Sequence, residues 1–248
     1  MSLSERWGIR KQPAATCRLR LVCFPFSGTG VSAFHGWRSH LPDWIDFCPL
    51  ALPGREVRYR EPPFTDVATL VEEVCPLLLE SRDLPLALYG HSVGALLAFE
   101  LAQRMTRQAA PPVHLFLAAC RPPHLPNVMP PLHGIEDDEE FLANLQVQYR
   151  RLPDVVLRDA TLLASLVRTL RADLTMFETY RCTEPQMLDC PLTVMGGTQD
   201  WFAIEELAQW DRYTTGGSKV EMLPGDHFFM QTCPEQLTAQ ILADLQVR

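Results

Sequence analysis

The sequence predicts an α/β protein with a mostly parallel central sheet, helices on both faces and a helical lid insertion. Short apolar runs containing β-branched residues alternate with longer segments in which apolar residues recur every three or four positions. A chain of 248 residues with 47% hydrophobic residues can bury a substantial core and is typical of one domain. We therefore expect a single domain over 1–248, with its core at about 16–120 and 189–248 and the lid at about 121–188.

Six apolar segments are expected to be strands, and each ends at a loop signal, mostly Pro or Gly. They are Arg18–Phe24, Ile45–Leu52, Leu86–Tyr89, Val113–Ala119, Pro191–Met195 and Lys219–Leu223. Four other segments have the helical period and supply crossovers between parallel strands. They are Asp66–Leu79, Val93–Arg107, Ile204–Arg212 and Pro234–Gln246.

The stretch 121–188 interrupts this alternation. It contains a Pro-rich loop, an acidic segment at Glu136–Glu140, and helical periodicity over Phe141–Tyr149 and Val155–Tyr180. Helices inserted here would lie over the carboxyl ends of the strands, where open α/β sheets bind ligands, so we interpret the stretch as a lid. The alternative is an elaborated crossover with no functional motion.

Composition and charge limit the classes of partner and the cellular location expected for this chain. A net charge of −8 with no basic stripe argues against nucleic acid. The first 15 residues lack the apolar core of a signal peptide, and no apolar run approaches the roughly 20 residues of a membrane-spanning helix. We expect a cytoplasmic monomer that does not bind membranes. The eight cysteines lack metal-ligand spacing, which favours reduced, buried thiols over disulfides or zinc.

The candidate nucleophile is Ser92, at the centre of Gly90–Gly94, which reads Gly-His-Ser-Val-Gly. An apolar strand precedes this segment and an apolar helix follows it, as a nucleophile elbow requires. Glycines leave room where the strained turn brings the strand and the helix together, so that the hydroxyl projects from the sheet. A tight Gly/Ser turn is the alternative for the motif taken alone.

A serine hydroxyl needs a base, and His227 is the best placed of seven histidines. It follows the last expected strand and precedes the last helix, where the α/β-hydrolase fold places its base. His91 lies inside the elbow but is expected to point away from the serine, His114 begins a strand, and the others fall outside the order Ser, acid, His. His124 is a candidate for the cavity entrance.

Asp200 is the expected acid, because it follows the strand Pro191–Met195 at its carboxyl end and can fix the tautomer of His227. Asp226, beside the histidine, and Asp189, before the strand, are geometrically poorer. A helix N-cap is the alternative role for Asp200.

Two backbone N–H groups should form the oxyanion hole, that of Val93 after the nucleophile and one from the loop after the first strand. We assign the second donor to Phe26, with Ser27 as the alternative. Residues 28–33 of this loop also read Gly-x-Gly-x-x-Ala, a dinucleotide-binding pattern. The acid that should end the second strand is missing, which argues against that function.

Taken together, these segments resemble the type II (external, editing) thioesterases of polyketide synthases and nonribosomal peptide synthetases. The similarity extends nearly end to end, and its departures are Thr29, Trp201 and Asp226. The matching segments are Phe24–Gly28, Leu52–Arg58, Glu61–Pro63, Gly90–Gly94, Leu170–Leu174, Glu178–Tyr180, Gly196–Asp200 and Gly225–Phe229.

The resemblance implies hydrolysis of wrongly attached acyl groups from the phosphopantetheine arm of acyl or peptidyl carrier protein domains. It implies a Ser92-His227-Asp200 triad with an acyl-enzyme and no metal or bound cofactor. The residues alone also leave open a general carboxylesterase or lipase, a product-releasing thioesterase and a non-catalytic binding protein. Met129, Met176 and Phe177 are candidates to line the acyl channel, with plain core packing as the alternative.

Overall fold

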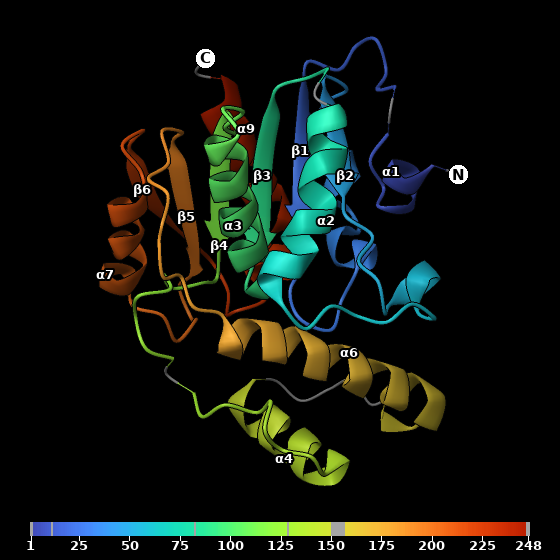
Figure 1. Ribbon diagram of the computed structural model, residues 1–248. Helices are drawn as coiled ribbons and strands as arrows, with labels where there is room; N and C mark the ends of the chain where they lie inside the picture. The colour runs from blue at the N-terminus through green and yellow to red at the C-terminus, as the bar shows by residue number, and fades with distance from the viewer. Residues whose placement is uncertain (1, 11, 82, 128, 150–156, 247–248) are drawn as a thin grey trace.

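The computed structural model describes residues 2–10, 12–81, 83–127, 129–149 and 157–246. Its centre is a six-stranded sheet in the order β2-β1-β3-β4-β5-β6, and all five pairings are parallel (Figure 1). The strands are β1 (Leu19–Phe24), β2 (Ile45–Pro49), β3 (Leu86–His91), β4 (His114–Ala118), β5 (Leu192–Gly197) and β6 (Ser218–Leu223). The six strands and the α/β-hydrolase fold class predicted from the sequence are confirmed.

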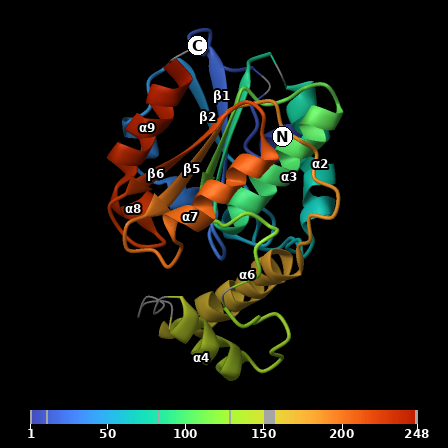
Figure 2. The ribbon, with the colours of Figure 1, turned by 90° about the vertical axis from the view of Figure 1, so that its left-hand side faces the viewer.

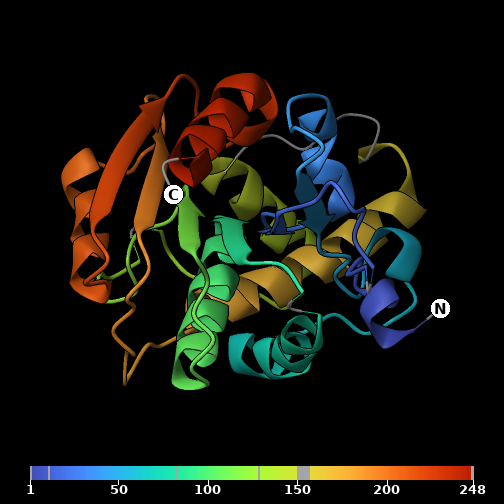
Figure 3. The same ribbon diagram turned by 90° about the horizontal axis from the view of Figure 1, so that it is seen from above.

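Helices cover both faces of the sheet (Figures 2 and 3). One face carries α2 (Val67–Glu80), α3 (Val93–Arg107), α7 (Ile204–Leu207) and the 3₁₀ helix η4 (Ala208–Tyr213). The other carries η1 (Val31–Phe34), η2 (Trp37–Ser39), α8 (Phe229–Thr232) and α9 (Pro234–Gln246). The short helices α1 (Leu3–Arg6) and η3 (Glu56–Arg58) complete the part outside the insertion.

Strand side chains alternate between the two covered faces, as a sheet buried on both sides requires. In β1, Val22 and Phe24 join the cluster under α2 and α3, whereas Leu21 and Cys23 join the cluster under α9. The chain order reverses at β1, which lies between β2 and β3. Ligands bind at the carboxyl ends of strands beside such a reversal, so the loops after β1 and β3 are positioned to form a site.

The helical insertion lies between β4 and β5 and spans residues 119–191. Its two long helices are α4 (Asp138–Gln148) and α6 (Ala160–Thr179), capped by Asp137 and Asp159. Helix α6 runs across the carboxyl ends of the strands, with α4 on its far side (Figure 1). The insertion has its own small apolar cluster, made of Leu132, Phe141, Leu145, Val167, Leu170 and Leu174.

Buried polar contacts attach α6 to the rest of the chain. The Arg55 guanidinium donates to both carboxylate oxygens of Asp173 at 2.7 and 2.8 Å. Asp173 also accepts from the Gly28 N–H at 2.8 Å, and its side chain is 1% exposed. Closer to the C-terminal end of α6, Glu178 accepts from the backbone N–H groups of Leu132 and His133. The bidentate pair thus fixes the helix over the sheet, and Glu178 fixes the loop before α4 against α6.

The structure differs from the sequence prediction at the ends of several elements, including β3, β5 and α4. The expected helix Ile204–Arg212 is α7 followed by η4, and β2 ends at Pro49 rather than Leu52. In the expected segment Val155–Tyr180, helix α6 covers Ala160–Thr179, and residues 155 and 156 lie outside the described residues. Pro49 is tolerated because β2 is an edge strand, and the next residue, Leu50, still donates its N–H to the Cys23 carbonyl at 2.9 Å.

All eight cysteines have free thiols, and six of them are buried. Among the helices of the described residues, none combines the length and the apolar character needed to span a bilayer.

Candidate active site

Ser92 lies at a sharp turn between β3 and α3 and has the strained dihedral angles φ 56° and ψ −119°. A Cβ at Gly90 would lie 2.0 Å from the carbonyl oxygen of Gly94. A Cβ at Gly94 would lie 2.5 Å from the carbonyl oxygens of Phe24 and Pro25. Only glycine fits either position, and both glycines let the strand, the helix and the loop after β1 converge beneath the serine. The geometry is that of a nucleophile elbow.

The acid and base predicted from the sequence lie side by side. His227 Nδ1 is 3.2 and 3.3 Å from the two carboxylate oxygens of Asp200, and the two side chains are 4% and 0% exposed. The backbone N–H of Trp201 also donates to Asp200 at 2.8 Å. The N-cap role for Asp200 is wrong, because α7 begins after Ala203.

Ser92 and His227 line the same cavity, but no hydrogen bond joins them within the described part of the chain. Such contacts are often long without substrate and tighten when it binds. Asp226 has a different partner, accepting from the Phe228 N–H at 2.9 Å.

His91 is fully buried behind the elbow. Burial is the main cause that lowers its pKa to about 3, so the ring is neutral. Its Nε2–H donates to the carbonyl oxygen of His227 at 2.7 Å, which leaves Nδ1 to accept from the Tyr89 hydroxyl at 3.2 Å. His91 therefore does not serve the serine as a base, in agreement with the sequence prediction, and instead joins the elbow to the loop of His227.

The loop after β1 carries Phe26, whose ring packs against the rings of His91 and Phe228. The close approach of Gly94 to this loop brings it to the start of α3, where Val93 is the first residue. Phe26 and Val93, the predicted oxyanion donors, thus lie on the two backbone segments that meet at Ser92. Ser27 follows on the same loop and is partly exposed.

The N–H groups further along this loop are bonded to side chains of the chain itself. Glu56 accepts from the N–H groups of Val31 and Ser32 at 2.9 and 3.0 Å, and Asp173 accepts from that of Gly28. A Cβ at Gly30 would lie 2.6 Å from the Glu56 carboxyl carbon. The glycine pattern that resembles a dinucleotide fingerprint therefore binds two carboxylates of this protein.

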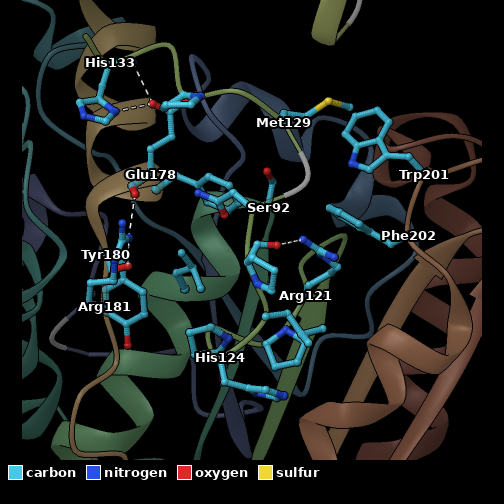
Figure 4. A pocket seen from close by; sticks show the side chains of 18 of the residues that line it. Ser92, Arg121, His124, Met129, His133, Glu178, Tyr180, Arg181, Trp201 and Phe202 are labelled. Carbon is cyan, nitrogen blue, oxygen red and sulfur yellow. Dashed lines mark hydrogen bonds and ion pairs between the residues drawn. The ribbon is translucent and has the colours of Figure 1, made fainter.

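A cavity of about 580 Å³ is lined by Ser92 and His227. Figure 4 shows Ser92 among the labelled side chains of its wall. Its walls are the loop between β4 and α4, the end of α6, and Trp201 with Phe202. Met129, Phe177 and His124 line it, whereas Met176 is 1% exposed and belongs to the core. Tyr149 lines it as a neutral phenol, because burial raises its pKa to about 12. The insertion thus supplies most of the wall of a pocket of ligand size.

Two contacts in the wall follow from no local sequence pattern. The Trp201 indole stacks on the His227 imidazole, with 4.5 Å between ring centroids and 14° between planes. Arg121 pairs with Glu206 at 2.5 Å and donates to the carbonyl of Pro126. The only sequence feature that bears on the stack is the position of Trp201, directly after the expected acid Asp200.

Within the described ranges no three His, Cys, Asp or Glu side chains are grouped to hold a metal ion.

A parallel sheet of this order, with a nucleophile elbow after β3 and an acid and a base after β5 and β6, defines a protein of the α/β-hydrolase class. The thioesterase domain model matches residues 19–245. The chain belongs to this thioesterase family and is accordingly a hydrolase that acts on thioesters.

Three similar proteins illustrate the match. Gramicidin S biosynthesis protein GrsT of Aneurinibacillus migulanus is 34% identical over 232 residues, covering 93% of this chain and 90% of the relative. The solved structure of RedJ, a thioesterase from the prodiginine biosynthetic pathway in Streptomyces coelicolor, is 38% identical with a TM-score of 0.80, over 94% of this chain and 86% of RedJ. That of BorB, the type II thioesterase from the borrelidin biosynthetic cluster, is 26% identical with a TM-score of 0.84, over 99% and 98% of the two chains.

Proposed function

We propose that this protein is a type II thioesterase that hydrolyses aberrant or stalled acyl groups from the phosphopantetheine arms of carrier proteins. The observation that carries the proposal is the Asp200–His227 pair at 3.2 Å, which borders the same cavity as Ser92 in a chain of the thioesterase family. Asp200 orients the imidazole and stabilises its protonated form. No metal or cofactor takes part in the proposed reaction.

In the first half-reaction, Ser92 Oγ forms a bond to the thioester carbonyl carbon while His227 Nε2 takes the hydroxyl proton. The N–H groups of Phe26 and Val93 stabilise the negative charge that develops on the carbonyl oxygen. The carbon–sulfur bond then breaks, and His227 gives its proton to the leaving thiolate. The products are a free phosphopantetheine thiol and an acyl ester on Ser92.

In the second half-reaction, His227 takes a proton from water as the water oxygen attacks the acyl carbon. The bond to Ser92 Oγ breaks, and His227 returns the proton to the serine. A carboxylic acid leaves the cavity, and the enzyme regains its starting state. His227 takes and returns one proton in each half-reaction, so a single histidine can serve both.

The proposed partners are acyl or peptidyl carrier domains of a polyketide synthase or nonribosomal peptide synthetase. GrsT, RedJ and BorB, named for gramicidin S, prodiginine and borrelidin biosynthesis, support this choice. We place the enzyme in the cytoplasm as a monomer, in one domain whose insertion serves as a lid.

The test compares acyl carrier-protein thioesters with p-nitrophenyl esters of the same acyl groups. The proposal expects faster turnover of the carrier thioesters and loss of both activities in Ser92→Ala. Faster turnover of the oxygen esters would instead favour a general carboxylesterase. Full activity in Ser92→Ala would overturn the catalytic role of Ser92.

A further inference from the structure

Trp201 contacts both the catalytic loop and the insertion. Its indole face lies on the His227 imidazole, 4.5 Å away and nearly parallel to it. The Tyr149 ring, at the end of α4, meets the same indole at 5.9 Å and 73°. Trp201 therefore fills the space between the base and the inserted helices.

The indole also forms part of the cavity wall. Trp201 is 36% exposed and lines the cavity together with Ser92, His227 and Tyr149. The acyl atoms next to the reacting carbonyl must lie within bonding reach of Ser92 and near His227. Since Trp201 covers one face of His227, its indole borders the position of those first acyl carbons.

Resting on the thioesterase function proposed above, we propose that Trp201 determines acyl specificity by restricting bulk beside the carbonyl and also positions the His227 ring. The substrates that fit are acyl groups unbranched at the carbon next to the carbonyl. Branched groups meet the indole, which cannot move without losing its contacts with His227 and Tyr149.

Stacking also acts on the reaction itself. His227 becomes an imidazolium when it takes the serine proton, and an aromatic face within about 6 Å attracts a cation. The indole also limits rotation of the imidazole, which keeps Nε2 directed toward the serine. Removal of the indole should therefore slow the chemical step for every substrate and relax selection against branched ones.

The experiment measures kcat and KM for acetyl, propionyl, butyryl and isobutyryl pantetheine thioesters in wild type, Trp201→Ala and Trp201→Phe. In Trp201→Ala we expect kcat for acetyl to fall about 5- to 30-fold from loss of the cation–π contact. We expect the preference for butyryl over isobutyryl in kcat/KM to fall about tenfold, the usual effect of a methyl group in a pocket. Trp201→Phe keeps a ring on His227 and should restore most of kcat but little of the selectivity.

Ile204→Ala is the matched control, because Ile204 is an exposed apolar side chain three positions after Trp201 and lies outside the described lining of the cavity. It should leave kcat for acetyl unchanged. An equal loss of kcat/KM for butyryl and isobutyryl in Trp201→Ala would overturn the specificity role. Unchanged kcat in a folded Trp201→Ala would overturn the positioning role.

The p-nitrophenyl esters of the same acyl groups are measured in parallel. If thioesters are not hydrolysed but the oxygen esters are, the thioesterase proposal fails while the role of Trp201 is still decided on the esters. Thermal unfolding of each variant identifies any loss caused by misfolding.

Discussion

Two regions of the molecule are held in place by different means. One is the edge of the sheet that carries Ser92, Asp200 and His227, here called the catalytic edge after its proposed role, and the other is the helical insertion above it. The edge is built from close backbone packing, with Gly90 and Gly94 allowing a strand, a helix and a loop to converge under Ser92. The insertion has a small apolar cluster of its own, is joined to the rest of the chain through the buried Asp173–Arg55 pair, and contributes Met176 to the core under α2 and α3. Backbone convergence fixes the loops around Ser92, whereas a buried ion pair together with side-chain packing holds the wall of the cavity.

This difference separates chemistry from substrate choice. Backbone convergence at the elbow leaves little freedom, since any added Cβ meets a main-chain atom. The insertion can change its side chains while its ion pairs keep α6 in position. Trp201 is the exception, because it belongs to the catalytic edge and contacts Tyr149 of the insertion.

The largest expected effect is at the catalytic edge. Asp200→Asn should lower kcat about ten-thousand-fold, because an amide in this position favours the wrong tautomer of His227. The free energy of unfolding should change little, since the side chains keep similar size. Steady-state kinetics and urea unfolding measure both quantities.

Asp226→Asn is the matched control, a neighbouring carboxylate that bonds to the Phe228 N–H rather than to His227 Nδ1. We expect it to lower kcat less than tenfold. A larger loss in Asp226→Asn than in Asp200→Asn would show that Asp226, not Asp200, is the acid partner of His227.

A smaller effect is expected where the insertion is attached. Asp173→Asn leaves the Arg55 guanidinium buried without its counter-charge, which should lower the free energy of unfolding by about 3–5 kcal/mol. Asp138→Asn removes an exposed ion pair with Arg171 and should change it by less than about 1 kcal/mol. Urea unfolding of the two variants compares a buried pair between α6 and the rest of the chain with a more exposed pair inside the insertion, and equal losses would contradict the importance given to burial.

The smallest expected effect concerns histidines. His91 is fully buried at the catalytic edge, whereas His133 of the insertion is partly exposed and pairs with Glu178. Because the pKa of His91 is lowered to about 3 in the folded state, only the unfolded state binds this proton between about pH 6.5 and 3. Stability from this group is complete above about pH 6.5 and is lost as the pH falls toward 3.

From about pH 7 to pH 5 the loss due to His91 should be about 2 kcal/mol, and His91→Gln should lack it. Urea unfolding at the two pH values measures the difference between wild type and variant. His133→Gln serves as the comparison from the insertion. Identical pH dependence in wild type and His91→Gln would show that folding does not lower the pKa of His91.

The elements that the sequence predicted well are those set by local pattern. Helix α3 has its predicted ends, Val93 and Arg107, and the six strands follow the apolar runs. The order Ser, acid, His placed Asp200 beside His227 because each follows a strand of a parallel sheet, and such strands end at one edge.

Contacts between distant residues could not be obtained in this way. Arg55 and Asp173 are 118 positions apart, and nothing in either segment alone identifies the partner. The stack of Trp201 on His227 depends on how two loops meet, which strand and helix periodicity do not specify. The end of the Ile204–Arg212 segment as a 3₁₀ helix rather than an α-helix also lies outside what apolar spacing resolves.

The glycine-rich loop after β1 has one more consequence. Glu56 and Asp173 occupy N–H groups with which a loop of this kind elsewhere binds the phosphates of a nucleotide. Two carboxylates of the chain itself thus accept the hydrogen bonds that the phosphates of a dinucleotide would accept from such a loop in a dehydrogenase. The N–H groups at residues 28, 31 and 32 therefore have their hydrogen-bond partners within the chain, and the conformation of the loop does not depend on a nucleotide.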